Sequence, residues 1–245
     1  MIHVIEFGPA PANIVDRATV ARLRDQLALA AEDKSIKLVV LKGEGDHFSY
    51  GASVQEHTPD LVGGMLSEFH EFMRFVDQLD LPPLMAAVKG RCFGGGFEVA
   101  LLCDIIAVAD DALLGCPEIS LGVFPPAGSA LLPLRTTAGR ASEMLSTGRF
   151  VDAQTAVDYG IAEYKFSADD FMHDIEQWAE KSFGKLSASS LRQTRKASRW
   201  PFSHALETVL PKLEAQYLES LMATNDASEG ISAFIDKRKP EWQNA

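Results

Sequence analysis

The chain predicts an α/β fold built on parallel strand pairings. Short apolar runs bounded by glycine or proline recur along residues 1–185, as expected for buried strands. Amphipathic helical patterns separate these runs, and strands that alternate with helices are typical of parallel sheets. From about residue 185 only helical patterns remain. We therefore predict two domains: an α/β core with the candidate site at 1–185, and a helical region at 186–245.

The N-terminal segment begins with a strand-like run at residues 2–7. Residues 16–32 then place their apolar side chains on one helical face, and Asp16 or Thr19 is a suitable N-cap. The next apolar run, LVVL within residues 37–42, predicts an inner strand of the sheet.

A glycine-punctuated loop at residues 43–51 leads to Ala52, whose backbone N–H can point into a cleft. Residues 53–64 are polar and contain one proline and two glycines, which predicts a mobile loop able to act as a lid. A strongly amphipathic helix is expected at 65–79. Its apolar face consists of Leu66, Phe69, Phe72, Met73 and Val76.

The stretch at residues 82–121 organises the rest of the chain. An apolar strand at 84–88 precedes three glycines at 94–96 and a helix of buried character. A helix that opens on glycines leaves backbone N–H groups without intrahelical partners, and its dipole favours a negatively charged oxygen there. Two glutamates, Glu98 and Glu118, lie within this largely apolar stretch. It therefore offers an oxyanion site with acid–base groups nearby.

Further strands are expected at 105–109 and near Leu113, and Pro125–Pro126 fixes a rigid bend after Glu118. The remaining pattern is helical, with stop signals such as Gly148 and Gly160. The expected helices are 138–147, 152–159, 168–183, 187–199, 203–224 and 227–237.

Composition narrows the classes of partner. The net charge of −11 argues against a nucleic-acid partner, which needs a basic surface. No apolar run approaches the ~20 residues of a membrane helix, and MIHVIEFGP lacks the basic and apolar regions of a secretory signal. We expect a cytoplasmic protein without a membrane partner.

The thiols and imidazoles give no sign of a metal site. The three cysteines match no zinc spacing, no base accompanies them, and we expect reduced thiols without a catalytic role. The histidines at 47, 57 and 70 show no tight spacing either, so no metal site is expected. His70, on the long helix, is expected at the surface or at an interface. The cysteines are Cys92, Cys103 and Cys116.

Taken together, these residues resemble the crotonase (enoyl-CoA hydratase/isomerase) superfamily over nearly the whole chain. The densest part of the resemblance is AAVKGRCFGGGFEVALLCDIIAVADDALLGCPEISLGVFPPAG, which starts at Ala86. Supporting pieces are HFSYGAS before it, STGRFVDAQTAVDYGI after it and EGISAFIDKRKPEW near the end. The glycines are not a dinucleotide fingerprint, because Val99 stands where that motif requires glycine.

The resemblance implies a fold and an assembly. The family fold is a spiral of repeated ββα units, and a C-terminal helical region drives trimer formation. Trimers commonly pair, which implies a homotrimer or a hexamer. The implied substrate is an acyl-CoA thioester, and no separate cofactor is implied because coenzyme A is part of that substrate.

The resemblance also implies roles for single residues. Ala52 and Gly95 match the two backbone N–H donors that polarise the thioester carbonyl. Glu98 and Glu118 match the glutamates with which family hydratases add water to a conjugated double bond. The expected substrate-binding residues are Ser53, His57, Phe124 and Pro126, with Phe234 and Lys237 in the coenzyme pocket of a neighbouring subunit.

The chemistry explains why these residue types are needed. Adding water to an α,β-unsaturated thioester builds negative charge on the thioester oxygen, and rigid backbone donors stabilise that charge. Two carboxyl groups can divide the proton transfers if their environments push their pKa values apart. Our hypothesis is that Glu98 orients and deprotonates water while Glu118 gives a proton to the substrate carbon.

The chain departs from the commonest family pattern at three positions. Tyr50 stands where the loop usually has alanine. Ser53 stands where the loop usually has aspartate, and Pro126 stands where many hydratases have glycine. Proline has no N–H, so Pro126 cannot donate a hydrogen bond to a bound water. The FSYGASV loop and the FPP turn are similar to the branch that hydrates cyclic dienoyl-CoA thioesters.

Several alternatives stay open at this point. The chain could be a double-bond isomerase that uses one glutamate, a hydrolase of the same family, or a non-catalytic acyl-CoA-binding scaffold. Glu98 could be an ion-pair partner of Arg91 or Arg149, and Glu118 could be a solvated residue at a strand end. The basic run at 237–239 could be a solvated tail.

Overall fold

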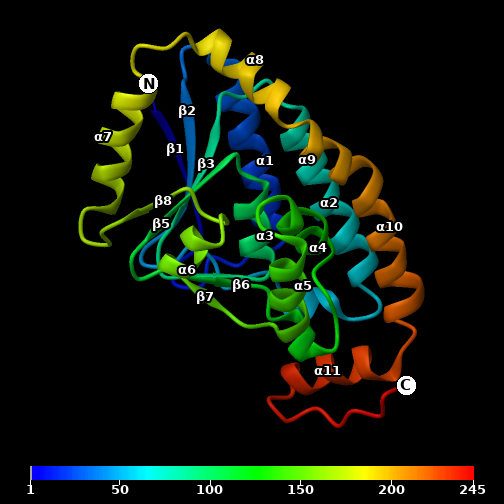
Figure 1. Ribbon diagram of the computed structural model, residues 1–245. Helices are drawn as coiled ribbons and strands as arrows, with labels where there is room; N and C mark the ends of the chain where they lie inside the picture. The colour runs from blue at the N-terminus through cyan, green and yellow to red at the C-terminus, as the bar shows by residue number, and fades with distance from the viewer. Residues whose placement is uncertain (1) are drawn as a thin grey trace.

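The computed structural model describes residues 2–245 and confirms the α/β prediction (Figure 1). Its main sheet has five parallel strands in the order β1-β2-β3-β5-β8. Their bounds are β1 Ile2–Phe7, β2 Leu38–Gly43, β3 Leu84–Val88, β5 Ile105–Ala109 and β8 Tyr164–Phe166. A smaller sheet has the order β4-β6-β7, with bounds Arg91–Phe93, Leu113–Gly115 and Val151–Asp152.

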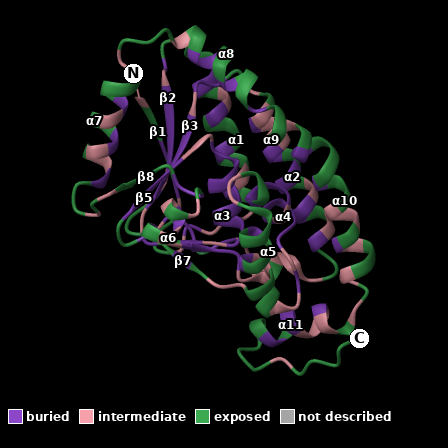
Figure 2. Ribbon diagram, in the orientation of Figure 1, coloured by how far each residue is buried: buried purple, intermediate pink, exposed green. Residues whose placement is uncertain are grey.

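The main sheet is covered on both faces, because successive side chains of a strand point to opposite sides. Val39 and Leu41 of β2 belong to the larger apolar core, which they share with helices α1, α2 and α3. Leu38 and Val40 point the other way, into a smaller cluster that α7 (Phe171–Phe183) completes. Figure 2 shows the inner strands β2, β3 and β5 buried along most of their length, with exposed residues on the outer faces of the helices.

Two long helices, α1 (Arg17–Glu32) and α2 (Val62–Gln78), pack against the larger core. Asp16 caps α1 by accepting a hydrogen bond from the Thr19 N–H at 2.7 Å, so the cap is Asp16 and not Thr19. The α2 helix begins at Val62 and includes Gly63 and Gly64, which we expected in the preceding loop. That loop also contains a single 3-10 turn, η1 (Val54–His57).

The central part of the chain turns from the sheet into a group of short helices. Their bounds are α3 Gly95–Leu102, η2 Glu118–Leu121, α4 Pro126–Leu131, η3 Leu132–Leu134, α5 Ala138–Thr147 and α6 Ala153–Asp158. All of α3 is buried, and α4 packs beside it. The proline bend predicted after Glu118 is the start of α4, where Pro126 takes the first helical position.

The C-terminal region is helical, as expected, but the predicted helix at 203–224 is not a regular α-helix. Its elements are α9 Trp200–His204, η4 Ala205–Val209, α10 Leu210–Ala215 and η5 Gln216–Leu221, and both η4 and η5 are π-helical turns. Before them comes α8 (Ala188–Ser198), and α11 (Asn225–Ile235) follows. The division into domains at residue 185 stays a prediction.

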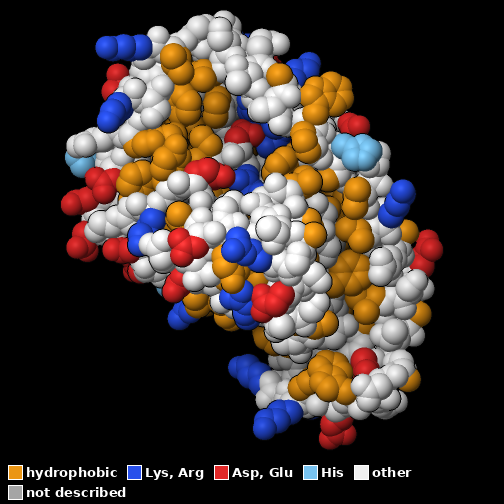
Figure 3. Space-filling view, in the orientation of Figure 1, with side chains coloured by type: hydrophobic (Ala, Val, Ile, Leu, Met, Phe, Trp, Pro, Cys, Tyr) orange, Lys and Arg blue, Asp and Glu red, His pale blue; other side chains and the backbone are white. Residues whose placement is uncertain are grey.

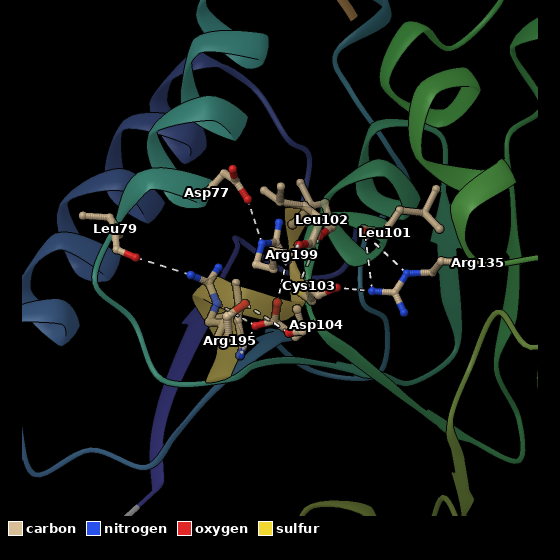
Figure 4. Close-up of polar contacts among 12 residues, drawn as sticks. Asp77, Leu79, Leu101, Leu102, Cys103, Asp104, Arg135, Arg195 and Arg199 are labelled. Atoms are coloured by element: carbon tan, nitrogen blue, oxygen red, sulfur yellow. Dashed lines mark hydrogen bonds and ion pairs between the residues drawn. The ribbon is translucent and has the colours of Figure 1, made fainter. Parts of the chain in front are cut away.

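Buried arginines join this helical region to the core (Figure 4). Arg195 donates to Asp104 Oδ2 at 2.7 Å, and Arg199 donates to Asp77 Oδ1 at 2.7 Å and to Asp104 Oδ1 at 2.5 Å. Arg192 donates to backbone carbonyls, including that of Ile36 at 2.9 Å. These contacts fix the helices α8 and α9 against β3, β5 and α2.

The last helix, α11, lies apart from the row formed by α8, α9 and α10, at the bottom of Figure 1. It contacts η1 and η2, on either side of the candidate site in sequence. The chain then folds back, and Asp226 accepts hydrogen bonds from the Gln243 and Asn244 N–H groups at 2.7 and 2.8 Å. The C-terminal segment is thereby tied to the first turn of α11.

Candidate active site

The structure brings Ala52 and Gly95 together, while their shared role as N–H donors to one acyl oxygen stays a prediction. A Cβ atom placed on Gly95 would lie 3.1 Å from the Ala52 nitrogen. A parallel bridge from Ser49 to Cys92 joins the two segments, and a second bridge, from Val15 to Ala52, ties the Ala52 segment to the residues that precede α1. Within residues 2–245 neither N–H donates to a protein acceptor. Gly95 begins α3, so both the free N–H and the helix dipole favour an anionic oxygen at this point.

Glu98 lies in the first turn of α3 and is 5% exposed. Its Oε1 accepts a hydrogen bond from the Gly128 N–H of α4 at 2.7 Å. Arg149 binds Glu143 and Tyr159 instead, at 2.6 and 3.1 Å, so the alternative of a Glu98–Arg149 ion pair is wrong. Among the described residues no cation forms a salt bridge with Glu98.

Burial raises the pKa of Glu98 above its ordinary value. The Gly128 N–H, the positive charge of His70 and the Ala127 N–H act in the opposite direction and favour the ionised carboxylate. Glu98 is therefore a buried acid whose charged form has specific partners.

Glu118 opens the 3-10 turn η2, and its carboxyl group points toward Gly94. A Cβ on Gly94 would lie 2.6 Å from Glu118 Oε1, and Gly94 has φ +49°, so glycine at 94 makes room for this carboxyl. Glu118 Oε2 is buried without a hydrogen-bond partner in the described chain. The alternative of a solvated residue at a strand end is therefore wrong.

Burial and the negative charge of Glu98 raise the pKa of Glu118 to about 8. The two carboxyl groups thus differ in environment, since backbone N–H groups of α4 oppose the effect of burial at Glu98, whereas the charge of Glu98 adds to the effect of burial at Glu118. This difference favours Glu98 as the base of the pair and Glu118 as the acid.

Ser53 and His57 lie on the loop that follows Ala52. The His57 Nδ1 is 2.8 Å from the Ser53 carbonyl oxygen, and burial lowers the pKa of His57. These contacts order the turn η1 next to the candidate oxyanion site. A small cavity of about 10 Å³, lined in part by Ala52, Met65 and Phe69, has room for one water.

Phe124 and Pro126 flank the carboxyl groups along the chain. The Phe124 ring lies 5.4 Å from the ring of Tyr217, edge to face, and Pro126 begins α4. Because proline lacks an N–H, the first backbone donor that α4 offers to Glu98 comes after it, and Gly128 supplies the hydrogen bond.

Phe234 and Lys237 do not join the other candidate residues within this chain. Phe234, on α11, is 53% exposed, and Lys237 is exposed with φ +55°. Their implied role involves a neighbouring subunit and stays a prediction.

Two polar residues near Glu98 escaped the sequence reasoning. The expectation that His70 lies at the surface is wrong: it is 0% exposed, and its Nδ1 is 2.6 Å from Glu214 Oε2. Tyr217 is 1% exposed and reaches the same region from η5. His70 shares a helix face with Phe69 and Met73, and a polar residue in such an apolar stripe was the one available signal.

The thiols are buried and unreactive. Burial raises the pKa of Cys103 to about 12 and the pKa of Cys92 and Cys116 well above the ordinary value. Within residues 2–245, no three His, Cys, Asp or Glu side chains are grouped so as to hold a metal ion. No helix in this part of the chain is both long and apolar enough to cross a membrane.

Comparison with known proteins identifies the family to which this chain belongs. The sequence model of the enoyl-CoA hydratase/isomerase family matches residues 2–245. The chain is 41% identical to cyclohexa-1,5-dienecarbonyl-CoA hydratase of Thauera aromatica, over 95% of this chain and 89% of that protein. It is 34% identical to 2,3-dehydroadipyl-CoA hydratase of Escherichia coli, over 96% of this chain and 92% of that protein.

Solved structures show the same fold. An enoyl-CoA hydratase from Bacillus anthracis superposes with a TM-score of 0.76 at 30% identity, over 100% of this chain and 96% of that one. One from Mycobacterium avium superposes with a TM-score of 0.86 at 25% identity, over 99% and 94%. The likeness therefore covers the core and the helical region together.

Proposed function

The chain belongs to the enoyl-CoA hydratase/isomerase family, and on that premise we propose that it is a lyase that adds water to an α,β-unsaturated acyl-CoA thioester. One observation carries the proposal. Glu98 is buried, its charge acts on the half-buried Glu118, and their surroundings differ, while neither acid forms a salt bridge within residues 2–245. An isomerase needs one such acid, whereas hydration uses a base for water and an acid for carbon.

In the proposed mechanism the thioester oxygen accepts hydrogen bonds from the N–H groups of Ala52 and Gly95. Negative charge develops on that oxygen as the enolate forms, and donors already in place stabilise it. The loss of one such donor typically costs ~3–4 kcal/mol in the transition state. Backbone donors suit this role because they cannot titrate.

The carboxyl groups then move the protons. Glu98 takes a proton from water while the water oxygen bonds to the electrophilic carbon of the substrate. The electrons of the double bond move to the thioester oxygen, and Glu118 gives its proton to the nucleophilic carbon. Each acid thus changes its protonation state once, and the product is a hydroxyacyl-CoA.

We propose a cyclic dienoyl-CoA as the substrate, hydrated by 1,4-addition across a ring diene conjugated to the thioester. The support is the relative with 41% identity, which is named for cyclohexa-1,5-dienecarbonyl-CoA, together with the FSYGASV loop and the FPP turn. Phe124 and Pro126 are the proposed walls of the acyl pocket, and their flat, rigid surfaces suit a planar ring.

The coenzyme A part of the substrate is proposed to contact Ser53 and His57 of this chain and Phe234 and Lys237 of a neighbouring copy. This requires a homotrimer or hexamer, which we propose as the assembly. Figure 3 shows apolar side chains at the surface along α9 and α10, where Trp200 is 74% exposed. A cytoplasmic location without a separate cofactor fits this chemistry.

The decisive experiment is incubation with crotonyl-CoA and with cyclohexa-1,5-dienecarbonyl-CoA, followed by mass spectrometry. We expect the mass of one water to be added, faster with the cyclic thioester. A shifted double bond at unchanged mass would make the protein an isomerase, and binding without change would make it a scaffold.

Substitution of each glutamate tests the catalytic role proposed for it. Glu98→Gln and Glu118→Gln should each lower kcat by ~100- to 10,000-fold, the contribution of a general acid or base, with little change in thioester binding. Glu71→Gln, an exposed residue on α2, is the matched control and should retain full activity. If both site variants hydrated at near the wild-type rate, the assignment would be wrong.

A further inference from the structure

Tyr217 has a buried hydroxyl group without a hydrogen-bond partner in the described part of the chain. The side chain is 1% exposed, and its oxygen contacts neither solvent nor a protein donor or acceptor. A buried tyrosine hydroxyl usually finds a partner, and leaving it unpaired costs ~1–3 kcal/mol. An unpaired polar group at this depth therefore calls for a function.

The Tyr217 side chain lies in the region of the two candidate catalytic carboxyl groups. The Tyr217 ring packs edge to face on Phe124, which lies between Glu118 and α4 along the chain. Burial and the negative charges of Glu118 and Glu98 raise the pKa of Tyr217, so it keeps its proton and stays a donor. Glu118 Oε2, in the same region, is also buried without a partner.

The backbone that delivers Tyr217 is irregular. Residues 216–221 form the π-helical turn η5, in which the Met222 N–H donates to the Tyr217 carbonyl at 2.9 Å. π-Helical turns interrupt regular helices at some cost and occur frequently at functional sites. Here the turn changes the direction of the side chain relative to a regular helix.

The start of α4, which faces Glu98, has few donors left for a water molecule. Pro125 and Pro126 have no N–H, the Gly128 N–H is bound to Glu98 Oε1, and the Ala127 N–H is also directed at Glu98. Glu98 itself only accepts when ionised. A nucleophilic water held by Glu98 therefore lacks a donor from α4, and the Tyr217 hydroxyl is an uncommitted donor close to both carboxyl groups.

We propose that the Tyr217 hydroxyl donates a hydrogen bond to the oxygen that water contributes, first in the attacking water and then in the hydroxyl group of the product. This rests on the proposed hydration. Tyr217 exchanges no proton in the step: the water proton goes to Glu98, and Glu118 protonates carbon. Its role is to hold the oxygen in line with the electrophilic carbon, as a residue that contacts the reacting atoms.

The first test is Tyr217→Phe, which removes the hydroxyl group and keeps the ring against Phe124. Because the hydroxyl has no protein partner, the variant should melt at the same temperature as the wild type or higher. The value of kcat for hydration should fall ten- to a hundredfold, with KM within about threefold. Tyr164→Phe, a half-exposed tyrosine packed on Trp178, is the control and should change neither quantity.

The outcomes separate catalysis from structure. An unchanged kcat in Tyr217→Phe overturns the proposal. A lowered melting temperature that accompanies the lost activity also overturns it, because the hydroxyl would then have a structural partner.

A second test does not depend on turnover. The chain has four tyrosines, so protein labelled with ¹³C at the tyrosine Cζ gives a simple spectrum in which Tyr217→Phe identifies one resonance. We expect 3-hydroxybutyryl-CoA to shift the Tyr217 resonance and butyryl-CoA, which lacks the hydroxyl group, to shift it much less. Equal shifts, or no shift, overturn the role of Tyr217. If 3-hydroxybutyryl-CoA shifted the Tyr217 resonance selectively but the wild-type protein hydrated no substrate, the proposed hydratase function would be overturned and the contact with Tyr217 would stand.

Discussion

Substituting alanine for Gly94 tests the geometry of Glu118 without touching either acid. A Cβ at position 94 would lie 2.6 Å from Glu118 Oε1, whereas ordinary contacts begin at 3.4 Å. The carboxyl group must therefore move by about 0.8 Å, the difference between these two distances. Because it is the end of a flexible side chain, the movement costs little stability. The backbone, at φ +49°, costs ~1–2 kcal/mol once a Cβ is present.

The two effects have different readouts. A loss of ~1–2 kcal/mol lowers the melting temperature of a chain of this size by ~2–8 °C. A displacement of about 1 Å at a reacting group can cost ~100-fold in rate. We therefore expect Gly94→Ala to fold, to bind acyl-CoA and to hydrate it ~100-fold more slowly, as measured by steady-state kinetics and calorimetry.

The matched control is Gly139→Ala, in the first turn of α5, where a Cβ would meet no atom within 4 Å. It should keep full activity and gain up to ~1 kcal/mol of stability, because alanine favours the helix. If Gly94→Ala kept kcat within twofold of the wild type, the placement of Glu118 against Gly94 would not matter for catalysis, and the reasoning would be refuted.

Three further predictions concern charge. First, the pKa of Glu118 is raised to about 8 from an ordinary 4.5, so between these pH values the folded chain keeps a proton that the unfolded chain has lost. The free energy of unfolding should therefore fall as the pH rises from about 4.5 to 8, and it should fall less in Glu118→Gln. The rate of hydration should decline above about pH 8, where Glu118 loses its proton. Chemical unfolding and rates at a series of pH values test this, and parallel stability curves would contradict it. Second, His70→Gln should move the acidic limb of the kcat/KM profile to higher pH, because the positive charge of His70 lowers the pKa of Glu98; an unmoved limb would argue against it. Third, Arg199→Met should lower the free energy of unfolding in urea by ~3–5 kcal/mol, because it removes the buried partner of Asp77 and Asp104. The control Lys34→Met loses only an exposed ion pair with Asp80 and should lower it by ~0–1 kcal/mol. Equal losses in the two variants would contradict the argument from burial.

The sequence predicted the parts of the fold whose apolar pattern is local. The strands at 84–88 and 105–109 and the helix at 138–147 have the predicted bounds, because each is a single apolar run or stripe between clear stop signals. The strand Arg91–Phe93 was not foreseen, since three residues carry no periodicity and their pairing with Leu113–Gly115 is a tertiary feature. The π-helical turns were missed because one extra residue hardly changes a helical apolar pattern.

The candidate site was predictable where a motif spans it. Glu98, Glu118, Ala52 and Gly95 fall within two matched motifs, and the structure brings Ala52 to Gly95. His70 and Tyr217 were not predicted as site residues, because they reach the site from α2 and η5, far from either motif in sequence. Only the packing of α2 and η5 against the Val123–Phe124 segment shows that their polar side chains reach one region.

Asp104 shows how this protein treats a buried acid that serves stability. Burial alone would raise its pKa, but Arg199 and Arg195 outweigh that effect and hold the pKa below the ordinary value (Figure 4). Glu118 in the same molecule has one buried carboxyl oxygen and no salt bridge within residues 2–245, and its pKa rises to about 8. A chain able to place two arginines around one carboxylate has left Glu118 unpaired at the expense of folding free energy. The difference is accounted for if Glu118 must hold a proton near neutral pH and release it to substrate carbon.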